Sequence, residues 1–275
     1  MTQELFPLQT PTLKELSTIQ HGFFTRQGGE STGLYNSLNV SLSKEKTPDA
    51  ALQNRTHIAK PFQVPLANIC FLKQVHGNKP LFINGPYDSH TPTEADALVT
   101  PTPGLALSVQ TAVCVPLLLT DCKHPMIAAI HGGWRGLLSG IIENTIHLMQ
   151  QKSPAPLLLH AAIGPCITQD SYEVDQSIFE AFSQKDLALK IFFEKGKSPG
   201  KYQFDLPGLS RYLLTQAGVQ TVSTLDQDTY SNEERFFSCR RAFHKKEPSV
   251  GNQASCIMIK EPIRAIDLKK GNTMK

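Results

Sequence analysis

The sequence predicts a mixed α/β (α+β) protein in which β-sheets are flanked by helices within one domain spanning residues 1–275. Short apolar runs of strand length gather in the middle of the chain, and stretches with helical periodicity alternate with them. No repeat, coiled coil or linker-like segment divides the chain. Hydrophobic residues make up 40% of the 275, which is enough to bury a substantial core and excludes a disordered chain.

The elements before the core are expected to be strands and one helix. Residues 21–26 predict a strand, followed by a glycine turn at 27–30, and residues 49–59 predict a helix. A second strand is expected at 69–75, so that His76 closes it. Pro and Gly between these segments predict loops.

The core strands are expected where β-rich apolar runs are bounded by turn residues, at 105–109, 115–119 and 126–130. The third run leads into a glycine turn at 132–136, and the apolar residues of 137–150 then recur at helical spacing. Further on, the pattern predicts strands at 157–163, 221–225 and 254–259 and helices at 177–182 and 207–216. Pro207 at a first-turn position and Gly218 just past the end support the last helix.

Charge and composition exclude several classes of protein. The 27 basic and 24 acidic residues leave a net charge of +3, and the basic residues are scattered apart from a short tail, Lys269, Lys270 and Lys275, so nucleic acid is not expected as a partner. No run approaches the about 18 apolar residues of a membrane span, and residues 1–10 lack the features of a signal peptide. We therefore expect a cytoplasmic protein whose six cysteines are reduced thiols.

His76, Cys114 and His131 each lie where a predicted strand stops, which is where α/β folds place functional side chains. One thiolate and two imidazoles suit zinc, and three protein ligands leave a fourth position open, as in catalytic sites. Two His and one Cys also describe a blue-copper site, but multicopper chemistry needs more clustered histidines, and no two of the nine lie two residues apart. Spacing alone favours the simpler interpretation that each residue is buried with local partners.

Three arginines are candidate binding groups for an anionic part of a substrate. Arg135 lies in the glycine turn, where free backbone N–H groups at a helix start bind anions, although a tight turn that packs Trp134 explains the pattern equally well. Arg26 and Arg55 are further candidates, with surface salt bridges as the alternative. Cys122 and His124 form a Cys-x-His pair that we interpret as loop residues, because two ligands without a third make a poor metal site.

These residues belong to segments that occur in order along nearly the whole chain and together resemble the YfiH/YlmD family. The segments are His21-Gly22-Phe23-Phe24-Thr25-Arg26-Gln27-Gly28-Gly29, Ser37-Leu38-Asn39, Asn54-Arg55, Gln74-Val75-His76-Gly77, Ala95-Asp96-Ala97, Thr111-Ala112-Val113-Cys114, His131-Gly132-Gly133-Trp134-Arg135-Gly136, Ile163-Gly164-Pro165, Tyr172-Glu173-Val174 and Phe236-Phe237-Ser238-Cys239-Arg240-Arg241. That family was historically labelled multicopper polyphenol oxidase or laccase and is now regarded as zinc-dependent purine nucleoside phosphorylases, with human FAMIN as a relative.

The resemblance implies that His76, Cys114 and His131 are zinc ligands. It also implies phosphorolysis of adenosine, inosine, guanosine and methylthioadenosine, with hydrolytic deamination of adenosine, so that a purine nucleoside and phosphate are the expected partners. The implied fold is similar to the catalytic domain of cytotoxic necrotizing factors.

Four positions depart from the family pattern. Val113 stands where an Asp usually precedes the ligand Cys, and a valine accepts neither a proton nor a hydrogen bond. Asp228 and Asn252 replace a usual Cys and a usual Arg, and Cys239 replaces a usual Tyr. Val113 keeps open the alternative of a catalytically impaired zinc-binding member. A second alternative is a Cys-His hydrolase or deamidase, because a Cys and a His brought together can act as nucleophile and base.

Overall fold

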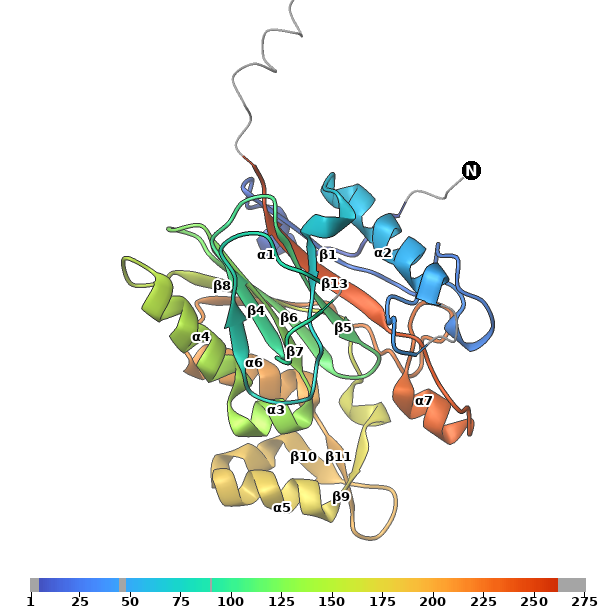
Figure 1. Cartoon of the computed structure of the whole chain (residues 1–275). Coiled ribbons are helices and arrows are strands. Elements are labelled where there is room, and N and C mark those ends of the chain that lie inside the picture. The colour runs from blue at the N-terminus through green and yellow to red at the C-terminus, as the bar shows by residue number, and fades with distance from the viewer. Residues whose placement is uncertain (1–4, 45–47, 90, 262–275) are drawn as a thin grey trace, which may run out of the picture.

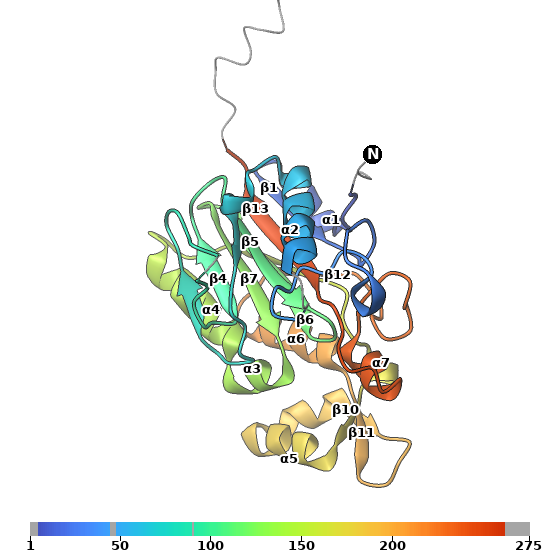
Figure 2. The same cartoon turned by 45° about the vertical axis from the view of Figure 1, so that its right-hand side comes forward.

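Two β-sheets stack face to face, and helices cover their outer faces (Figures 1 and 2). The computed structural model describes residues 5–44, 48–89 and 91–261. The four-stranded sheet has the order β1-β13-β5-β2, made of β1 (Ile19–Phe23), β2 (Ile69–Phe71), β5 (Ala106–Thr111) and β13 (Gln253–Ile259). The six-stranded sheet has the order β12-β8-β6-β7-β4-β3, made of β3 (Pro80–Phe82), β4 (Ala97–Thr100), β6 (Val115–Asp121), β7 (Met126–Gly132), β8 (Leu159–Ile163) and β12 (Thr221–Thr224).

The strands of the six-stranded sheet are apolar throughout because both of their faces are buried. In β6, Leu118 faces the four-stranded sheet, whereas Leu117 and Leu119 face the helices on the other side. In β7, Ala129 and Ala128 divide in the same way. A strand buried on both faces has a continuous apolar run in place of alternation, which explains why these strands are so visible in the sequence.

Each outer face is covered by helices that present an apolar stripe. Helix α2 (Pro48–Phe62) packs Ile58 and Phe62 on the four-stranded sheet, while α4 (Ile141–Lys152) and α6 (Leu206–Gln216) pack on the six-stranded sheet. The lower lobe in Figure 1 holds α5 (Gln176–Lys185) and a three-stranded sheet, β10-β11-β9, made of β9 (Glu173–Asp175), β10 (Phe193–Lys195) and β11 (Lys201–Phe204). The remaining short elements are α1 (Pro11–Lys14), α3 (Trp134–Ser139), α7 (Cys239–His244), η1 (Gly33–Tyr35), η2 (Leu66–Asn68), η3 (Gln169–Ser171) and η4 (Leu187–Phe192).

The mixed α/β fold class is confirmed, and two predicted elements differ from the structure. The helix expected at 137–150 is two helices, because Gly140 adopts a left-handed conformation with φ of 92° and separates α3 from α4. The strand expected at 69–75 ends at Phe71, so the prediction that His76 closes a strand is wrong. In place of a strand, the side chain of Gln74 accepts from the backbone N–H of Gln110 at 2.7 Å and donates to its carbonyl at 2.8 Å, which anchors a loop beside β5.

A few sequence-based expectations lie outside what the structure decides. The basic tail at Lys269, Lys270 and Lys275 lies beyond the described residues, and the single domain over residues 1–275 stays a prediction. Within the described ranges, none of the helices combines the length and the apolar character needed to cross a bilayer.

Candidate metal centre

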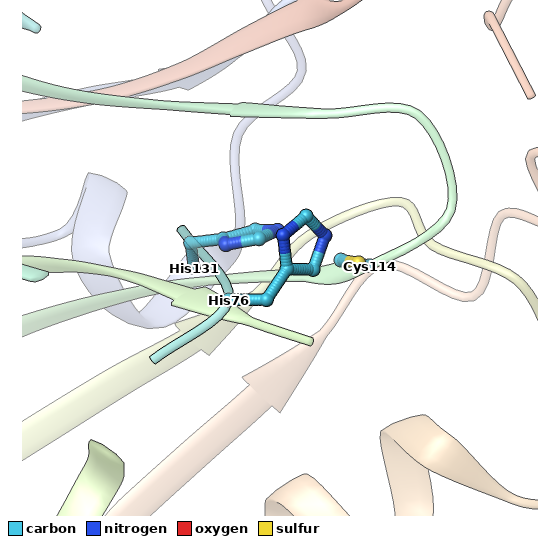
Figure 3. A group of neighbouring side chains, drawn as sticks. All are labelled: His76, Cys114 and His131. Atoms are coloured by element: carbon cyan, nitrogen blue, oxygen red, sulfur yellow. The ribbon is translucent and has the colours of Figure 1, made fainter. Parts of the chain in front are cut away.

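His76, Cys114 and His131 point toward one another at one end of the sheets (Figure 3). Their ligand atoms lie within 4.8 Å of one another, and the two imidazole rings meet edge to face with centroids 4.7 Å apart. His131 is buried, Cys114 is half-buried and His76 is exposed, so the group opens to solvent on one side. Zinc bonds of about 2.0–2.3 Å place ligand atoms roughly 3.5 Å apart, so small side-chain rotations suffice for these three to hold one ion.

Strand order brings two of the three ligands together. β6 and β7 pair antiparallel with Pro116 opposite His131, so Cys114, just before β6, lies beside the end of β7. β7 also pairs with β4, which places Asp96 beside His131. Cys114, His131 and Asp96, which are far apart in the sequence, thus meet at one end of the adjacent strands β6, β7 and β4.

Asp96 is a buried carboxylate that positions both histidines. Its side chain accepts a hydrogen bond from the backbone N–H of His76 at 2.9 Å and of Gly77 at 2.6 Å, and it lies 2.8 Å from Nδ1 of His131. The contact with Asp96 assigns the proton of His131 to Nδ1, so that Nε2 is left for a metal. Burial alone would raise the pKa of Asp96, but the hydrogen bonds from His131 and Gly77 outweigh it and hold that pKa below its usual value.

The backbone of the loop that carries His76 is held in a conformation that residues other than glycine rarely adopt. His76 has a φ of 60°, in the left-handed region. The hydrogen bonds from Asp96 on one side and the anchored Gln74 on the other fix this loop in place. A residue in a strained conformation at a cluster of polar side chains is a recurring feature of functional sites.

The glycines of the 132–136 turn allow close packing around the three ligands. A Cβ on Gly133 would lie 3.0 Å from Cδ2 of His76 and 3.4 Å from Sγ of Cys114, and one on Gly136 would lie 2.7 Å from the carbonyl oxygen of Gly77. Because α3 has only six residues, its start adds little to anion binding. The structure therefore gives these glycines a packing role.

Cys114 and His131 form a pair whose charges stabilise each other. Burial alone would raise the pKa of Cys114, but His131 and His76 outweigh it and lower that pKa to about 6. Burial likewise opposes the charge on His131, whereas the Cys114 thiolate and Asp96 raise its pKa to about 9. Cys114 differs in this from the other five cysteines, for which burial raises the pKa.

A pocket of about 490 Å³ opens over the three ligands. Its lining contains the basic residues Lys44, Lys73, Arg135 and Arg240 and, among the residues that the structure describes, no Asp or Glu. Larger hollows of about 820 and 550 Å³ lie beside β1 and α2, but within the described residues the only group of three metal-binding side chains is at this pocket. The pocket over the ligands is therefore the candidate site, and its charge favours an anionic ligand.

Of the three arginines expected to bind substrate, the structure places one in the pocket. Arg135 is exposed, lies over the ring of Trp134 at 4.3 Å and lines the pocket. Arg55 is buried, lies 3.8 Å from the centroid of the Phe71 ring and donates to the carbonyl of Val40 at 2.8 Å. Arg26 donates to the carbonyls of two loop residues, Asn36 and Glu233. The guanidinium groups of Arg26 and Arg55 thus contact the fold outside the lining of this pocket, and their expected role in substrate binding stays a prediction.

Of the four positions that depart from the family pattern, three line the pocket and one does not. Val113, Cys239 and Asn252 line the pocket, and the Val113 side chain also packs on the core beneath the six-stranded sheet. Asp228 lies outside the lining and binds loop groups, including the hydroxyl of Ser171 at 2.7 Å. Cys122 and His124 lie in the turn between β6 and β7, outside the metal-binding group.

Asp96 is the residue of the site that the sequence analysis left without a role. It stands in the quoted segment Ala95-Asp96-Ala97, directly before a run of apolar residues that forms β4. A charged residue between buried alanines is itself a signal, since carboxylates are almost never fully buried unless they are paired. Because β4 was not predicted as a strand, the sequence did not indicate that Asp96 lies beside His131.

Fold and site together define a mixed α/β protein with a pocket able to hold one metal ion through two histidines and a cysteine. A family model described as multi-copper polyphenol oxidoreductase laccase matches residues 20–260. A purine nucleoside phosphorylase of Rickettsia conorii is 34% identical over 243 residues, which cover 88% of this chain and 97% of the relative. Purine nucleoside phosphorylase YfiH of Escherichia coli is 35% identical over 237 residues, which cover 86% and 91%. The chain belongs to the YfiH family.

Solved structures agree with this assignment. A Neisseria meningitidis protein of known crystal structure superposes with a TM-score of 0.81 at 31% identity, covering 94% of this chain and 100% of that one. YlmD from Geobacillus stearothermophilus superposes with a TM-score of 0.80 at 28% identity, covering 94% and 98%. The fold and the family predicted from the motifs are therefore both confirmed.

Replacing Asp96 by Asn tests its positioning role. The amide nitrogen cannot accept the hydrogen bonds that the second carboxylate oxygen accepts, so we expect zinc affinity to fall by about 10- to 100-fold. Competition with a chromophoric chelator measures this. Asp121→Asn is the matched control, because Asp121 is also buried and accepts backbone N–H groups, but at the far end of the sheet. Equal zinc affinity in wild type and Asp96→Asn would show that Asp96 does not position the ligands.

Proposed function

We propose that this protein is a zinc-dependent purine nucleoside phosphorylase acting on adenosine, inosine, guanosine and methylthioadenosine, which also deaminates adenosine by hydrolysis. The observation that carries the proposal is the convergence of His76, Cys114 and His131 in a pocket with basic and no acidic lining among the described residues. Relatives at 34% and 35% identity are named purine nucleoside phosphorylases, which supports nucleoside and phosphate as substrates.

The chemistry of the three donors supports zinc as the metal. Two imidazoles and a thiolate match zinc in softness, and Asp96 leaves Nε2 of His131 free for the ion. When bound, a zinc ion with one open position supplies a Lewis acid to the pocket. Copper accepts the same donor set, so metal content after purification separates the two.

The protein's own side chains bind and orient the anionic substrate. A phosphate dianion in the pocket meets no carboxylate among the described lining residues, and Arg135 offers a planar pair of donors for it. The ring of Trp134 lies under that guanidinium and limits its motion. We further propose a cytoplasmic protein that acts on these small molecules and not on nucleic acid.

The first test is phosphate-dependent release of hypoxanthine from inosine by zinc-loaded protein. We expect turnover in wild type and a loss of at least about 100-fold in His76→Ala, because the open Lewis-acid site is lost. Elemental analysis of wild type, His76→Ala and Cys114→Ala should show about one zinc per chain in wild type alone. No hypoxanthine above the His76→Ala level would refute the phosphorylase proposal for this protein.

Val113 separates the two proposed activities. A phosphate dianion attacks without giving up a proton, whereas attack by water in deamination is accelerated by a general base, and Val113 supplies none at the pocket wall. We expect Val113→Asp to raise adenosine deamination by about 10²- to 10⁴-fold while inosine phosphorolysis changes much less.

Val113→Asn is the control for that substitution, because asparagine has a shape similar to that of aspartate but cannot act as a base. A gain in both activities to the same extent would contradict the assignment of a base to this position. It would indicate instead that the present protein is an impaired family member at the level of zinc or substrate binding.

A cysteine hydrolase or deamidase is the second candidate, and one observation favours it. Cys114, His131 and Asp96 are connected in the order of a nucleophile, a base and an orienting carboxylate. In a hydrolase of this kind the cysteine acts without metal. The two candidates therefore differ in what zinc does to the thiol.

Alkylation of metal-free protein by iodoacetamide distinguishes them. Because the pKa of Cys114 is lowered to about 6, its labelling should be half-maximal near that pH, well below the range of an ordinary thiol at about 8.5. Under the phosphorylase proposal, stoichiometric zinc blocks this labelling. Labelling that zinc leaves unchanged, followed by mass spectrometry, would favour the cysteine nucleophile.

A further inference from the structure

A lysine near the start of the chain and an asparagine near its end meet on the wall of the pocket. Nζ of Lys44 donates a hydrogen bond to Oδ1 of Asn252 at 3.0 Å, and both residues line the pocket. We infer that Lys44, positioned by Asn252, binds the phosphoryl group of the substrate. The role of Lys44 in the reaction rests on the proposed function, whereas its ability to bind a phosphoryl group does not.

The pair is built into the surrounding backbone. The hydroxyl of Tyr35 donates to the carbonyl of Lys44 at 2.6 Å, which fixes the turn that carries the lysine. The backbone N–H of Asn252 donates to Oδ1 of Asn39 at 2.9 Å, and Asn39 is fully buried. Lys44 and Asn252 are therefore each held at their backbone, and the ammonium group starts from an ordered position.

The positive charge of Lys44 is not neutralised by its hydrogen-bond partner, Asn252. Asn252 is neutral, and among the described residues Lys44 has no carboxylate within ion-pair distance. Lys73, another lysine of the same lining, differs, because its Nζ lies 2.9 Å from the carboxylate of Glu94. An amide oxygen orients an ammonium group without neutralising it, so Lys44 keeps a full charge for an anion.

Hydroxyl groups on the same turn complete the set of donors. Ser41 and Ser43 line the pocket with Lys44, and their Oγ atoms are 3.4 Å apart. A phosphoryl group has three acceptor oxygens and binds best where several donors converge on it. Residues 41–44 contribute one ammonium group and two hydroxyls to the pocket lining.

Lys44 lines the same pocket as the metal-binding group. Its charge acts on Cys239, where burial raises the pKa of the thiol and Lys44 opposes that rise. The backbone N–H of Cys239 donates to the carbonyl of Ala112 at 2.6 Å, two residues before Cys114. A phosphoryl group on Lys44 would therefore share one pocket with a ligand at the three metal-binding side chains.

The phosphoryl group could be inorganic phosphate or the 5′-phosphate of a nucleotide, since both present a dianion to the same donors. The experiment measures binding by calorimetry, with inorganic phosphate, inosine and inosine 5′-monophosphate as separate titrants on zinc-loaded protein. The variants are Lys44→Ala and Asn252→Asp, with Lys60→Ala, at an exposed lysine of α2 outside the pocket lining, as the matched control. Steady-state phosphorolysis gives kcat and the KM for phosphate of the same proteins.

We expect Lys44→Ala to weaken phosphate binding and raise the KM for phosphate by about 10- to 100-fold, with inosine affinity and kcat nearly unchanged. Asn252→Asp should lower phosphate affinity to a similar extent, because its carboxylate pairs with Lys44 and repels the anion. If the contact between Lys44 and Asn252 were merely structural, Asn252→Asp would not lower phosphate affinity, since an ion pair would keep Lys44 in place. Lys60→Ala should leave phosphate binding unchanged, because Lys60 lies outside the pocket lining.

The outcomes separate this assignment from the proposed function. Lys44-dependent binding of inorganic phosphate identifies that ion as the ligand, and Lys44-dependent binding of the nucleotide but not of free phosphate identifies the 5′-phosphate. Either result supports the site even if no phosphorolysis occurs. Phosphate and nucleotide affinities that are equal in wild type, Lys44→Ala and Asn252→Asp would overturn it, and phosphorolysis by all three would then leave the proposed function standing.

Discussion

A single buried carboxylate, Asp96, determines whether the site exists as a unit. It contacts the backbone of the loop around His76, which connects β2 of the four-stranded sheet to β3 of the six-stranded sheet, and the ring of His131 on β7. The loop needs this anchor because His76 is in a left-handed conformation, which has an energetic cost of about 1–3 kcal/mol that surrounding contacts must offset. The buried carboxylate in turn needs these donors, since an unpaired charge at this depth would be strongly destabilising. Loop geometry, ring orientation and charge at the site are therefore mutually dependent.

The sequence predicted the parts of the fold whose stabilising interactions are local or whose burial is complete. β6 and β7 were visible as uninterrupted apolar runs, and α6 was bounded by Pro207 and Gly218. The strands β9 to β11 are short, and β10 exposes two of its three residues, so they leave no such pattern. The break at Gly140 was not predicted, because a glycine within a helical periodicity is tolerated and its positive φ follows from how α3 and α4 pack.

The site was predicted in its residues but not in its geometry. Spacing along the chain cannot show that Cys114, His131 and Asp96 meet, since that depends on the order β6-β7-β4 within one sheet. The family resemblance supplied the grouping of the three ligands that spacing could not. The arginines show the limit of reasoning from residue type alone. Arg55 and Arg135 have the same chemistry, yet one lies buried on Phe71 and the other faces the pocket.

The positions of the three ligands have a mechanical consequence. His76 and Cys114 each lie on a connection between the two sheets, from β2 to β3 and from β5 to β6, and His131 belongs to β7 of the six-stranded sheet. An ion bound by all three would thus fasten these two connections to β7. Since such an ion binds the folded chain and not the unfolded one, its binding free energy adds to the free energy of unfolding by mass action. Removal of the metal would then lower the stability of the whole fold as well as empty the pocket.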